Sequence, residues 1–280
     1  MNRREFLKGS AAGIAAAATA ASTLGPAGCK GTPAGPQVPH RHIDRSTCIG
    51  CGECVTVCPM GAIVSSGGET WIEADECAEC GTCQRTRACP VDAIRPGALV
   101  WPRTLREVFS NPLSSHKATG VPGRGTEGIK TNDVTNRYQR GFVGVFIELG
   151  RPALGTRFRD VKRVLKVFRA RGYALLPENP VSSLIVDPAT GALSPEVLGE
   201  KAVSVLLEFL LPEEAAAELE DMLDEAAREV ETVFSVSVAL RADPDGASPF
   251  RRLFGPNTSL LPAGKVNVGL AVGIAGAQEG

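Results

Sequence analysis

The sequence has no excess of charge of either sign. Its 280 residues include 30 lysines and arginines and 31 aspartates and glutamates, for a net charge of -1. Nucleic-acid-binding domains usually carry a strongly basic surface, so we expect no nucleic-acid partner. Beyond residue 141 the chain also lacks a nucleotide-binding glycine loop, a flavin signature, a Cys-x-x-Cys-His haem motif and a catalytic triad. We therefore predict no catalytic residue.

A long hydrophobic run is missing as well. Residues 9–24 are rich in alanine, but this stretch is too short and too weakly apolar for a membrane helix, which needs about 20 apolar residues. It follows the charged start Arg3-Arg4-Glu5-Phe6-Leu7-Lys8, an arrangement typical of a signal peptide. The paired arginines resemble the twin-arginine (Tat) signal family, whose pathway exports folded proteins. The resemblance implies a location in the periplasm or at the extracytoplasmic membrane face.

The end of this leader allows two interpretations. Ala27-Gly28-Cys29 is similar to a bacterial lipoprotein processing site, which would give a lipid anchor at Cys29. Pro26, however, stands where that family prefers an aliphatic residue, so simple signal cleavage nearby stays equally open. In either case we interpret residues 1–29 as the signal peptide. Residues 30–45, which are rich in proline and glycine, are predicted to be a linker.

Cysteine, by contrast, is concentrated in one segment. Eight of the nine cysteines lie between Cys48 and Cys89. They form two copies of one pattern, Cys-x-x-Cys-Gly-x-Cys followed by Cys-Pro-x-x-Ala-Ile, over Cys48–Ile63 and Cys77–Ile94. Three thiolates two residues apart can wrap three iron corners of one cubane cluster. The pattern therefore predicts a metal-cluster site.

This repeat resembles the bacterial two-cluster ferredoxins, and the resemblance implies such a module over residues 46–102. In that family the fourth cysteine of each run ligates the other cluster. The resemblance therefore implies two [4Fe–4S] clusters with crossed ligands. The first would be held by Cys48, Cys51, Cys54 and Cys89, and the second by Cys77, Cys80, Cys83 and Cys58.

Four further residues of the motif are predicted to shape these sites. Gly52 and Gly81 lie where a side chain would crowd the approach of the backbone to a cluster. Pro59 and Pro90 would turn the chain away after each crossing ligand. The second copy departs from the family, because five residues (84–88) instead of the usual three precede its fourth cysteine. We expect this insertion to bulge as a loop without removing the ligand.

Zinc and disulfides are the alternatives for these cysteines. A zinc site normally takes four ligands from separated Cys-x-x-Cys pairs, which would leave the third cysteine of each triplet and both Cys-Pro pairs unexplained. Exported chains with an even number of cysteines often contain disulfides. Cys-x-x-Cys-x-x-Cys, however, places its thiols too close together for sensible pairing. Export of a folded protein also agrees with clusters that are assembled in the cytoplasm.

Residues 103–141 are predicted to be a polar, glycine-rich linker, and after it the hydrophobic residues are spaced regularly. Alternating residues predict strands, at 143–149, 173–176, 184–186, 203–209 and 234–240. Helical spacing predicts two helices, at 161–168 and 216–230. Apart from the further strand at 184–186, the order is strand–helix–strand–strand–helix–strand, which is similar to the α/β plait of ACT and NIL modules. We therefore expect an α+β protein with a plait domain over 142–243, and a C-terminal extension over 244–280 with an edge strand near 266–272.

The expected function is that of an exported electron-transfer protein, either a ferredoxin-type carrier or an electron-transfer subunit of an oxidoreductase. Its partner would be a redox protein or a membrane electron-transfer complex. The alternatives are a redox enzyme and a ligand-responsive redox sensor whose C-terminal domain binds a small molecule. Residues 157–171 are basic and residues 213–231 are acidic, and this complementarity permits a homodimer through the C-terminal domain.

Overall fold

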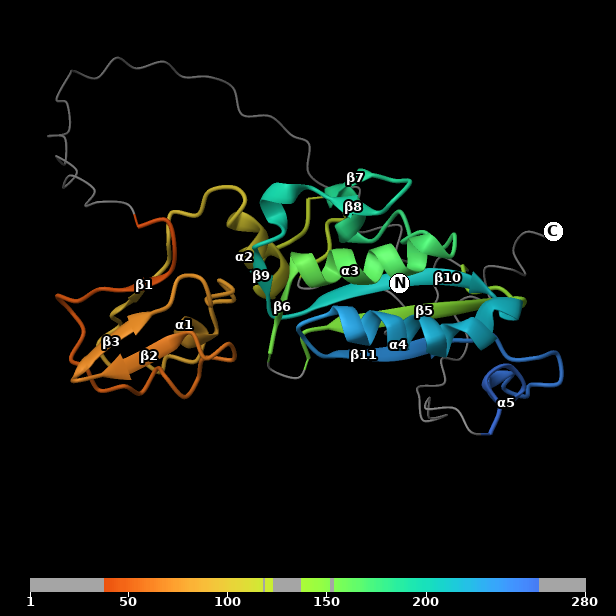
Figure 1. The fold of residues 1–280 in the computed structure, drawn as a ribbon. Helices are drawn as coiled ribbons and strands as arrows, with labels where there is room; N and C mark the ends of the chain where they lie inside the picture. The colour runs from red at the N-terminus through yellow and green to blue at the C-terminus, as the bar shows by residue number, and fades with distance from the viewer. Residues whose placement is uncertain (1–37, 118, 123–136, 152–153, 257–280) are drawn as a thin grey trace, which may run out of the picture. The chain divides into compact units, whose positions relative to one another are not determined.

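The computed structural model describes residues 38–117, 119–122, 137–151 and 154–256, which all lie within one compact unit. They form an α+β structure that begins with a cysteine-rich module, residues 38–102 (Figure 1). The elements of this module are short: β1 (His42–Ile43), β2 (Ile63–Ser66), β3 (Glu69–Ile72), α1 (Thr82–Arg85) and β4 (Ile94–Arg95). The leader, with Cys29, falls outside the described residues.

Strand pairing in the module follows the sequence repeat. β1 precedes the first cysteine run and pairs antiparallel with β4, which follows the second run. β3 precedes the second run and pairs antiparallel with β2, which follows the first. Each pair is extended by an equivalent hydrogen bond, from Asp44 N to Ala93 O at 2.8 Å and from Glu73 N to Ala62 O at 2.8 Å. This pairing carries the fourth cysteine of each run towards the start of the other run.

The two predicted linkers, 30–45 and 103–141, both contain regular structure. β1 lies inside 30–45, and helix α2 (Thr104–Ser110) begins the segment 103–141. α2 was missed because only Leu105 and Phe109, four residues apart, mark its apolar side. Both are buried in the core of the C-terminal domain. The predicted linker is therefore anchored at its start, while its residues 123–136 fall outside the described ranges.

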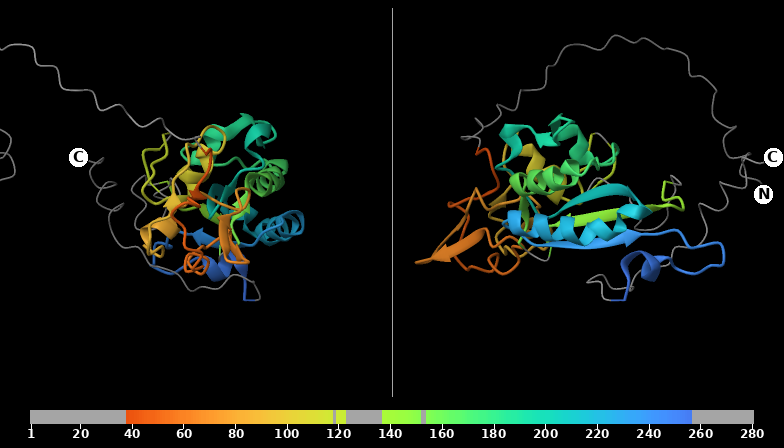
Figure 2. Two further views of the ribbon diagram at one scale, coloured as in Figure 1. Left: turned by 90° about the vertical axis from the view of Figure 1, so that its left-hand side faces the viewer. Right: turned by 45° about the vertical axis from the view of Figure 1, so that its right-hand side comes forward.

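The C-terminal domain (described residues within 142–243) is built on a three-stranded antiparallel sheet with the order β10-β5-β11. Its main elements are β5 (Phe142–Leu149), α3 (Phe158–Ala170), β10 (Val205–Pro212), α4 (Leu219–Glu229) and β11 (Phe234–Ala239). These elements confirm three of the predicted strands and both predicted helices. In Figures 1 and 2, α3 and α4 lie side by side against the sheet.

Packing explains why these segments take these forms. Val145 and Ile147 of β5 are fully buried under the helices, and burial of each such side chain contributes about 1.5–3 kcal/mol. Phe168 of α3 stacks on Phe209 of β10 with ring centroids 4.2 Å apart. Tyr138, packed with Phe146, belongs to a smaller cluster of buried residues.

Two of the predicted strands are not part of this sheet. The segment 173–176 makes one bridge, between Leu175 and Phe209, beside which Leu176 N donates to Glu208 O at 2.9 Å. The segment 184–186 overlaps β7 of a separate hairpin, β7 (Ile185–Asp187) and β8 (Ala192–Leu193). The remaining elements are the pair β6 (Thr156–Arg157) and β9 (Lys201–Ala202), 3-10 helices at Pro180–Leu184, Pro195–Val197 and Glu213–Glu218, and α5 (Phe250–Phe254). The predicted edge strand at 266–272 lies outside the described residues.

The opposite charges of the two main helices meet within the chain. Arg171, which ends α3, pairs with Glu225 of α4 at 2.6 Å, and Arg163 pairs with Glu231 at 3.1 Å. Charge complementarity is therefore satisfied inside the domain, which removes the reason for predicting a homodimer. Within the part of the chain that the structure describes, no helix is both long and apolar enough to cross a membrane.

Candidate iron–sulfur sites

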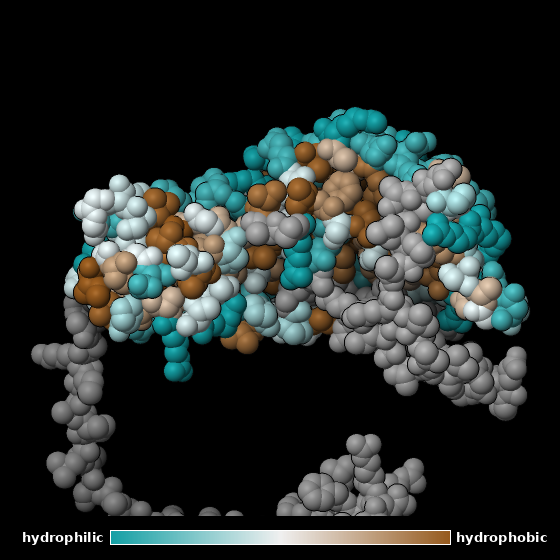
Figure 3. All heavy atoms as spheres, turned by 90° about the horizontal axis from the view of Figure 1, so that it is seen from below, coloured by the Kyte–Doolittle hydropathy of each residue, from teal (hydrophilic) through white to brown (hydrophobic). Residues whose placement is uncertain are grey.

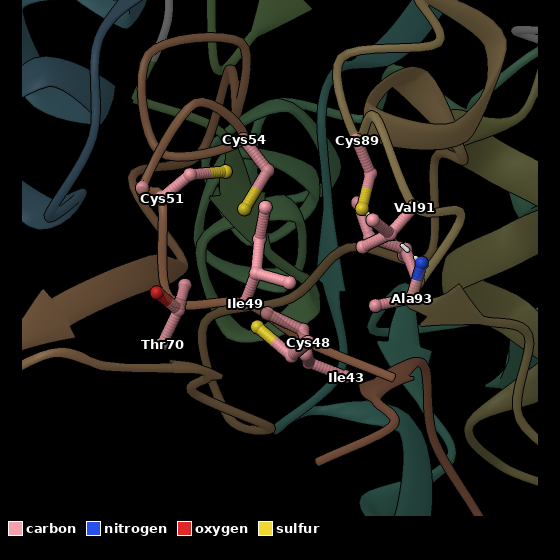
Figure 4. A pocket seen from close by; sticks show the side chains of 11 residues that line it. Ile43, Cys48, Ile49, Cys51, Cys54, Thr70, Cys89, Val91 and Ala93 are labelled. Atoms are coloured by element: carbon pink, nitrogen blue, oxygen red, sulfur yellow. Dashed lines mark hydrogen bonds between the residues drawn. The ribbon is translucent and has the colours of Figure 1, made fainter. Parts of the chain in front are cut away.

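The first site is a hollow at which four cysteines from both copies of the motif meet. Cys48, Cys51 and Cys54 come from the first copy, and Cys89 comes from the second. Figure 4 shows Cys51 and Cys54 on one side of this hollow, Cys89 on the other and Cys48 below. The other lining residues are uncharged: Ile43, Ile49, Gly52, Thr70, Val91, Ala93 and Ile94.

The second site repeats this arrangement with the copies exchanged. Cys77, Cys80 and Cys83 of the second copy line it together with Cys58 of the first. Its empty space, about 310 Å³ including space open to solvent, matches the 290 Å³ of the first site. The two hollows therefore suit groups of the same size. The structure thus brings together the two sets of four cysteines that the crossed ligand scheme groups.

The crossing cysteines accept hydrogen bonds from backbone groups at the same spacing in both copies of the repeat. Ala62 N donates a hydrogen bond to Cys58 Sγ at 3.2 Å, and Ala93 N donates to Cys89 Sγ at 3.1 Å. Both alanines are buried, so a larger side chain at either position would not fit beside the sulfur. Both copies share the pattern Cys-Pro-x-x-Ala, and this pattern is the sequence feature that marks these two donors.

The predicted glycines and prolines lie at the sites in different ways. Gly52 lines the first hollow and Gly81 the second, with φ of 74° and 69°. Glycine adopts this left-handed backbone readily, which is a second reason for glycine at both positions. Pro59 and Pro90 each begin a turn directly after a crossing cysteine. Pro59 also lines the second hollow, whereas Pro90 does not line the first.

The insertion in the second copy folds partly as a helix. α1 includes Gln84 and Arg85, and a turn follows it. Gln84 Nε2 donates to Ile94 O at 2.9 Å, and Arg85 donates to Cys80 O at 2.6 Å. The insertion therefore packs back onto the module, and Cys89 still lines the first hollow.

All eight cysteines are free thiols in the structure. Among the described residues, no three histidine, cysteine, aspartate or glutamate side chains are grouped tightly enough to bind a single metal ion. A single zinc ion draws its thiolates to about 2.3 Å from one centre, whereas a cluster binds each thiolate to a different iron. The donor set therefore fits an iron–sulfur cluster better than zinc.

Comparison with known proteins agrees with this donor set. The family model described as "4Fe-4S binding domain" matches residues 41–64. A ferredoxin-like protein in the vnf region of Azotobacter chroococcum mcd 1 is 47% identical over 53 residues, which cover 18% of this chain and 82% of that protein. The chain belongs to the ferredoxin family.

Further relatives place the likeness in the same module. Ferredoxin-1 of Rhodobacter capsulatus is 41% identical over 61 residues, covering 20% of this chain and 94% of that ferredoxin. Pyruvate synthase subunit PorD of Methanothermobacter marburgensis is 40% identical over 53 residues, covering 19% of this chain and 59% of that subunit. No solved structure matches the chain. These alignments cover at most a fifth of the chain each.

A second family model, for the TAT (twin-arginine translocation) pathway signal sequence, matches residues 1–25. This ferredoxin is therefore an iron–sulfur electron-transfer protein that binds [4Fe–4S] and carries a signal for Tat export out of the cytoplasm.

The two sites of this ferredoxin differ in exposure. In the first, Cys51 is exposed, and Ile49 beside it is 64% exposed. In the second, Cys77, Cys80 and Cys83 are all buried. Three of the four thiols of the second site are therefore buried, against one of the four at the first, so the second set is the more enclosed.

Burial also changes the acidity of the thiols. It raises the pKa of Cys77 to about 12, with a further rise from the Glu79 carboxylate, and raises the pKa of Cys83 to about 11. The Arg41 guanidinium lowers the pKa of Cys83 and so opposes the effect of burial there. In the first site burial raises the pKa of Cys54. Thiols must lose their protons to become ligands, so a cluster held by Cys77 and Cys83 would displace these protons.

Glu79 is a buried charge inside the second cysteine run, and motif analysis did not identify it. Its side chain is fully buried, and its φ of 54° is unusual for a residue other than glycine. Arg103 pairs with its carboxylate at 2.7 Å, and the Arg41 backbone N donates to it at 3.1 Å. The run therefore takes a strained conformation that two arginines stabilise.

Arg106 of α2 fixes the segment that leads into the second cysteine run. Its guanidinium donates to Asp75 O at 2.7 Å and to Cys77 O at 3.0 Å, and it also pairs with Glu200. The side chain is buried. No local sequence pattern predicts this residue, because its partners lie about 30 residues before it and 94 residues after it.

Charged residues of the C-terminal domain form ion pairs with the same segment. Arg157 pairs with Asp75 at 2.7 Å and with Glu76 at 2.9 Å, and Lys201 also pairs with Glu76. Met60, which lines the second hollow, packs against Gly155, where a Cβ would lie 2.7 Å from Met60 Cε. The C-terminal domain thus contacts residues that lie beside the second site.

Proposed function

We propose that this chain is an exported electron carrier, or an electron-transfer subunit of an oxidoreductase, that holds two [4Fe–4S] clusters. The observation that carries the proposal is the meeting of four cysteines at each of two hollows, three from one copy of the motif and one from the other. The first cluster is assigned to Cys48, Cys51, Cys54 and Cys89. The second is assigned to Cys77, Cys80, Cys83 and Cys58.

The chain's own residues supply ligands, hydrogen bonds and a barrier to water. When bound, each cluster accepts and releases single electrons. Backbone N–H groups of Ala62 and Ala93 donate to the crossing sulfurs, and such bonds help to set the potential. Ile43 lines the first site and Ile72 the second, so equivalent side chains exclude water from both.

The first site is the side at which we propose that electrons enter and leave. Cys51 and Ile49 are exposed there, and a partner can approach without displacing the C-terminal domain. The face drawn in Figure 3 shows hydrophobic residues in separate patches between hydrophilic ones. Small contacts are typical of transient electron-transfer complexes. The likeness to a pyruvate synthase subunit favours an oxidoreductase or another redox protein as the partner.

For the C-terminal domain we propose the α/β plait fold. The sheet order β10-β5-β11, with Leu175 bridged to β10, supports a plait whose second strand is reduced to a single bridge. Its contacts with Asp75 and Glu76 support a role in covering the second site.

The proposed location is the periplasm or the extracytoplasmic membrane face. Replacing Arg3 and Arg4 by lysine should retain the protein in the cytoplasm, measured by cell fractionation. Unchanged export would contradict the Tat route.

Iron analysis of anaerobically purified full-length protein tests the cluster content. We expect on the order of eight irons and eight sulfides per chain, with the absorbance of iron–sulfur clusters. An iron content of about four per chain would indicate a single cluster. A colourless protein with four disulfides would overturn the proposal.

A further inference from the structure

Two equivalent positions of the repeat carry different residues. Arg41 lies seven residues before Cys48, and Thr70 lies seven residues before Cys77. Each side chain lines the hollow of the other copy, Thr70 at the first site and Arg41 at the second. Both residues are only 6% exposed. Internal symmetry thus places a neutral hydroxyl at one site and a cation at the other.

Arg41 has a hydrogen-bond donor that the protein leaves unused. Its guanidinium donates to Gln84 of the insertion, and its Nε lies 3.6 Å from Glu79 Oε2, beyond hydrogen-bonding distance. Nε and Glu79 Oε2 are both buried, and neither has a hydrogen-bond partner. Buried polar groups in native proteins usually have a partner. The sulfur atoms of a cluster in the adjoining hollow are acceptors of the right kind, so the orphaned donor fits the group that the proposed function assigns there.

The surrounding charges leave a net positive charge at the second site. Arg41 and Arg103 both pair with the single carboxylate of Glu79. The first hollow has no charged residue in its lining apart from its cysteines. Reduction adds one electron and hence one negative charge to a cluster, and burial disfavours this charge. A buried cation nearby favours it.

We propose that Arg41 raises the reduction potential of the second cluster and so offsets the effect of its enclosure. This inference rests on the proposed function. Arg41 is a positioning residue that stabilises the reduced form, and the insertion contributes Gln84 to hold it. An electron that arrives at the exposed first site can then pass to the enclosed second one.

The test is a redox titration of the full-length holoprotein, followed by electron paramagnetic resonance. In Arg41→Gln, at a fixed applied potential, the ratio of reduced to oxidised second cluster should fall about tenfold, a shift of about 59 mV for one electron. The first cluster should titrate as in the wild type. Arg41→Lys keeps the charge and should recover most of the shift. Arg45→Gln is the matched control, because Arg45 is 78% exposed and its charge is screened by water.

A second variant keeps the test decisive if Arg41→Gln fails to load its second cluster. Glu79→Gln removes the neighbouring negative charge and should shift the second cluster in the opposite direction, towards easier reduction. The inference is overturned if the loaded variants leave the second cluster's potential unchanged, or if both clusters shift equally. Iron content separates the two proposals: fewer than about eight irons in the wild type would reject the two-cluster assignment itself.

Discussion

The two cysteine sites are copies of one motif, yet they are built into the protein by different means. At the first site, Gly50 occupies the position after Cys48-Ile49 with φ of 69°. At the second, Glu79 takes the equivalent position with φ of 54° and is held by two arginines. One copy thus reaches the left-handed conformation through glycine, and the other through buried charge pairs.

The difference extends to what stabilises each site. The first depends on close backbone packing, because a Cβ at Gly50 would collide with the carbonyl oxygen of Gly68. The second depends on residues far away in the sequence, among them Arg103 and Arg106. A shared ligand pattern therefore fixes where the thiols meet, while unshared surroundings fix exposure, charge and coupling to the C-terminal domain.

The largest expected effect comes from removing a crossing ligand. Cys58→Ser should remove or damage the second cluster and leave the first, although Cys58 belongs to the first copy. Cys89→Ser should do the reverse. Iron content and electron paramagnetic resonance of the anaerobic variants measure both. Loss of the first cluster in Cys58→Ser would show that the ligands are not crossed.

Arg106→Leu should affect the second site alone. The change removes a buried cation that pairs with Glu200 and donates to Asp75 O and Cys77 O. Breaking such a buried pair typically costs about 3–5 kcal/mol. We expect a lower free energy of unfolding, measured in urea, and preferential loss of the second cluster. Arg45→Leu at an exposed position is the control and should change neither.

Much of the site could be predicted from the sequence because its information is local and repeated. The resemblance of the cysteine repeat to two-cluster ferredoxins implies that Cys89 groups with the first copy and Cys58 with the second, and hydrophobic periods locate the three main strands and two helices of the C-terminal domain. The buried arginines were missed because their partners are remote, as for Arg106 and Glu200. Alignment of the two copies places Arg41 opposite Thr70, and this difference is the sequence feature from which a buried cation at one site could have been predicted.

The predicted strand at 173–176 failed for a different reason. Its apolar residues suit a strand, but the next acceptor along β10, Leu206 O, accepts a hydrogen bond from the side chain of Asn179 at 2.9 Å. One bridge, from Leu175, is all that forms. Local composition therefore predicted the position of this chain segment beside β10 and overestimated its regularity.

Gly50→Ala should be more harmful than Gly61→Ala. Both glycines have positive φ, so alanine costs about 1–2 kcal/mol at either position. A Cβ at Gly61 meets nothing within 4 Å, whereas one at Gly50 meets the Gly68 carbonyl. Gly50→Ala should therefore cost about 1–3 kcal/mol more and weaken the first cluster selectively. Equal urea midpoints for the two variants would show that backbone conformation alone matters here.

The smallest expected effect concerns the exposed acidic residues that join the second site to the C-terminal domain. Arg157 lowers the pKa of Asp75 from 3.8, chiefly by hydrogen bonding, and Lys201 lowers that of Glu76 from 4.5 in the same way. A carboxyl group whose pKa is lowered on folding stabilises the folded state above its unfolded pKa, and this contribution is lost as the pH falls through the folded value.

We therefore expect the wild type to lose more stability between pH 6 and pH 3 than the double variant Asp75→Asn/Glu76→Gln. The difference should stay small, about 1 kcal/mol or less, because both carboxylates are substantially exposed. Anaerobic urea unfolding at each pH, followed by circular dichroism, measures it. Parallel losses in the two proteins would mean that apolar packing, such as that of Met60 on Gly155, covers the second site without help from these ion pairs.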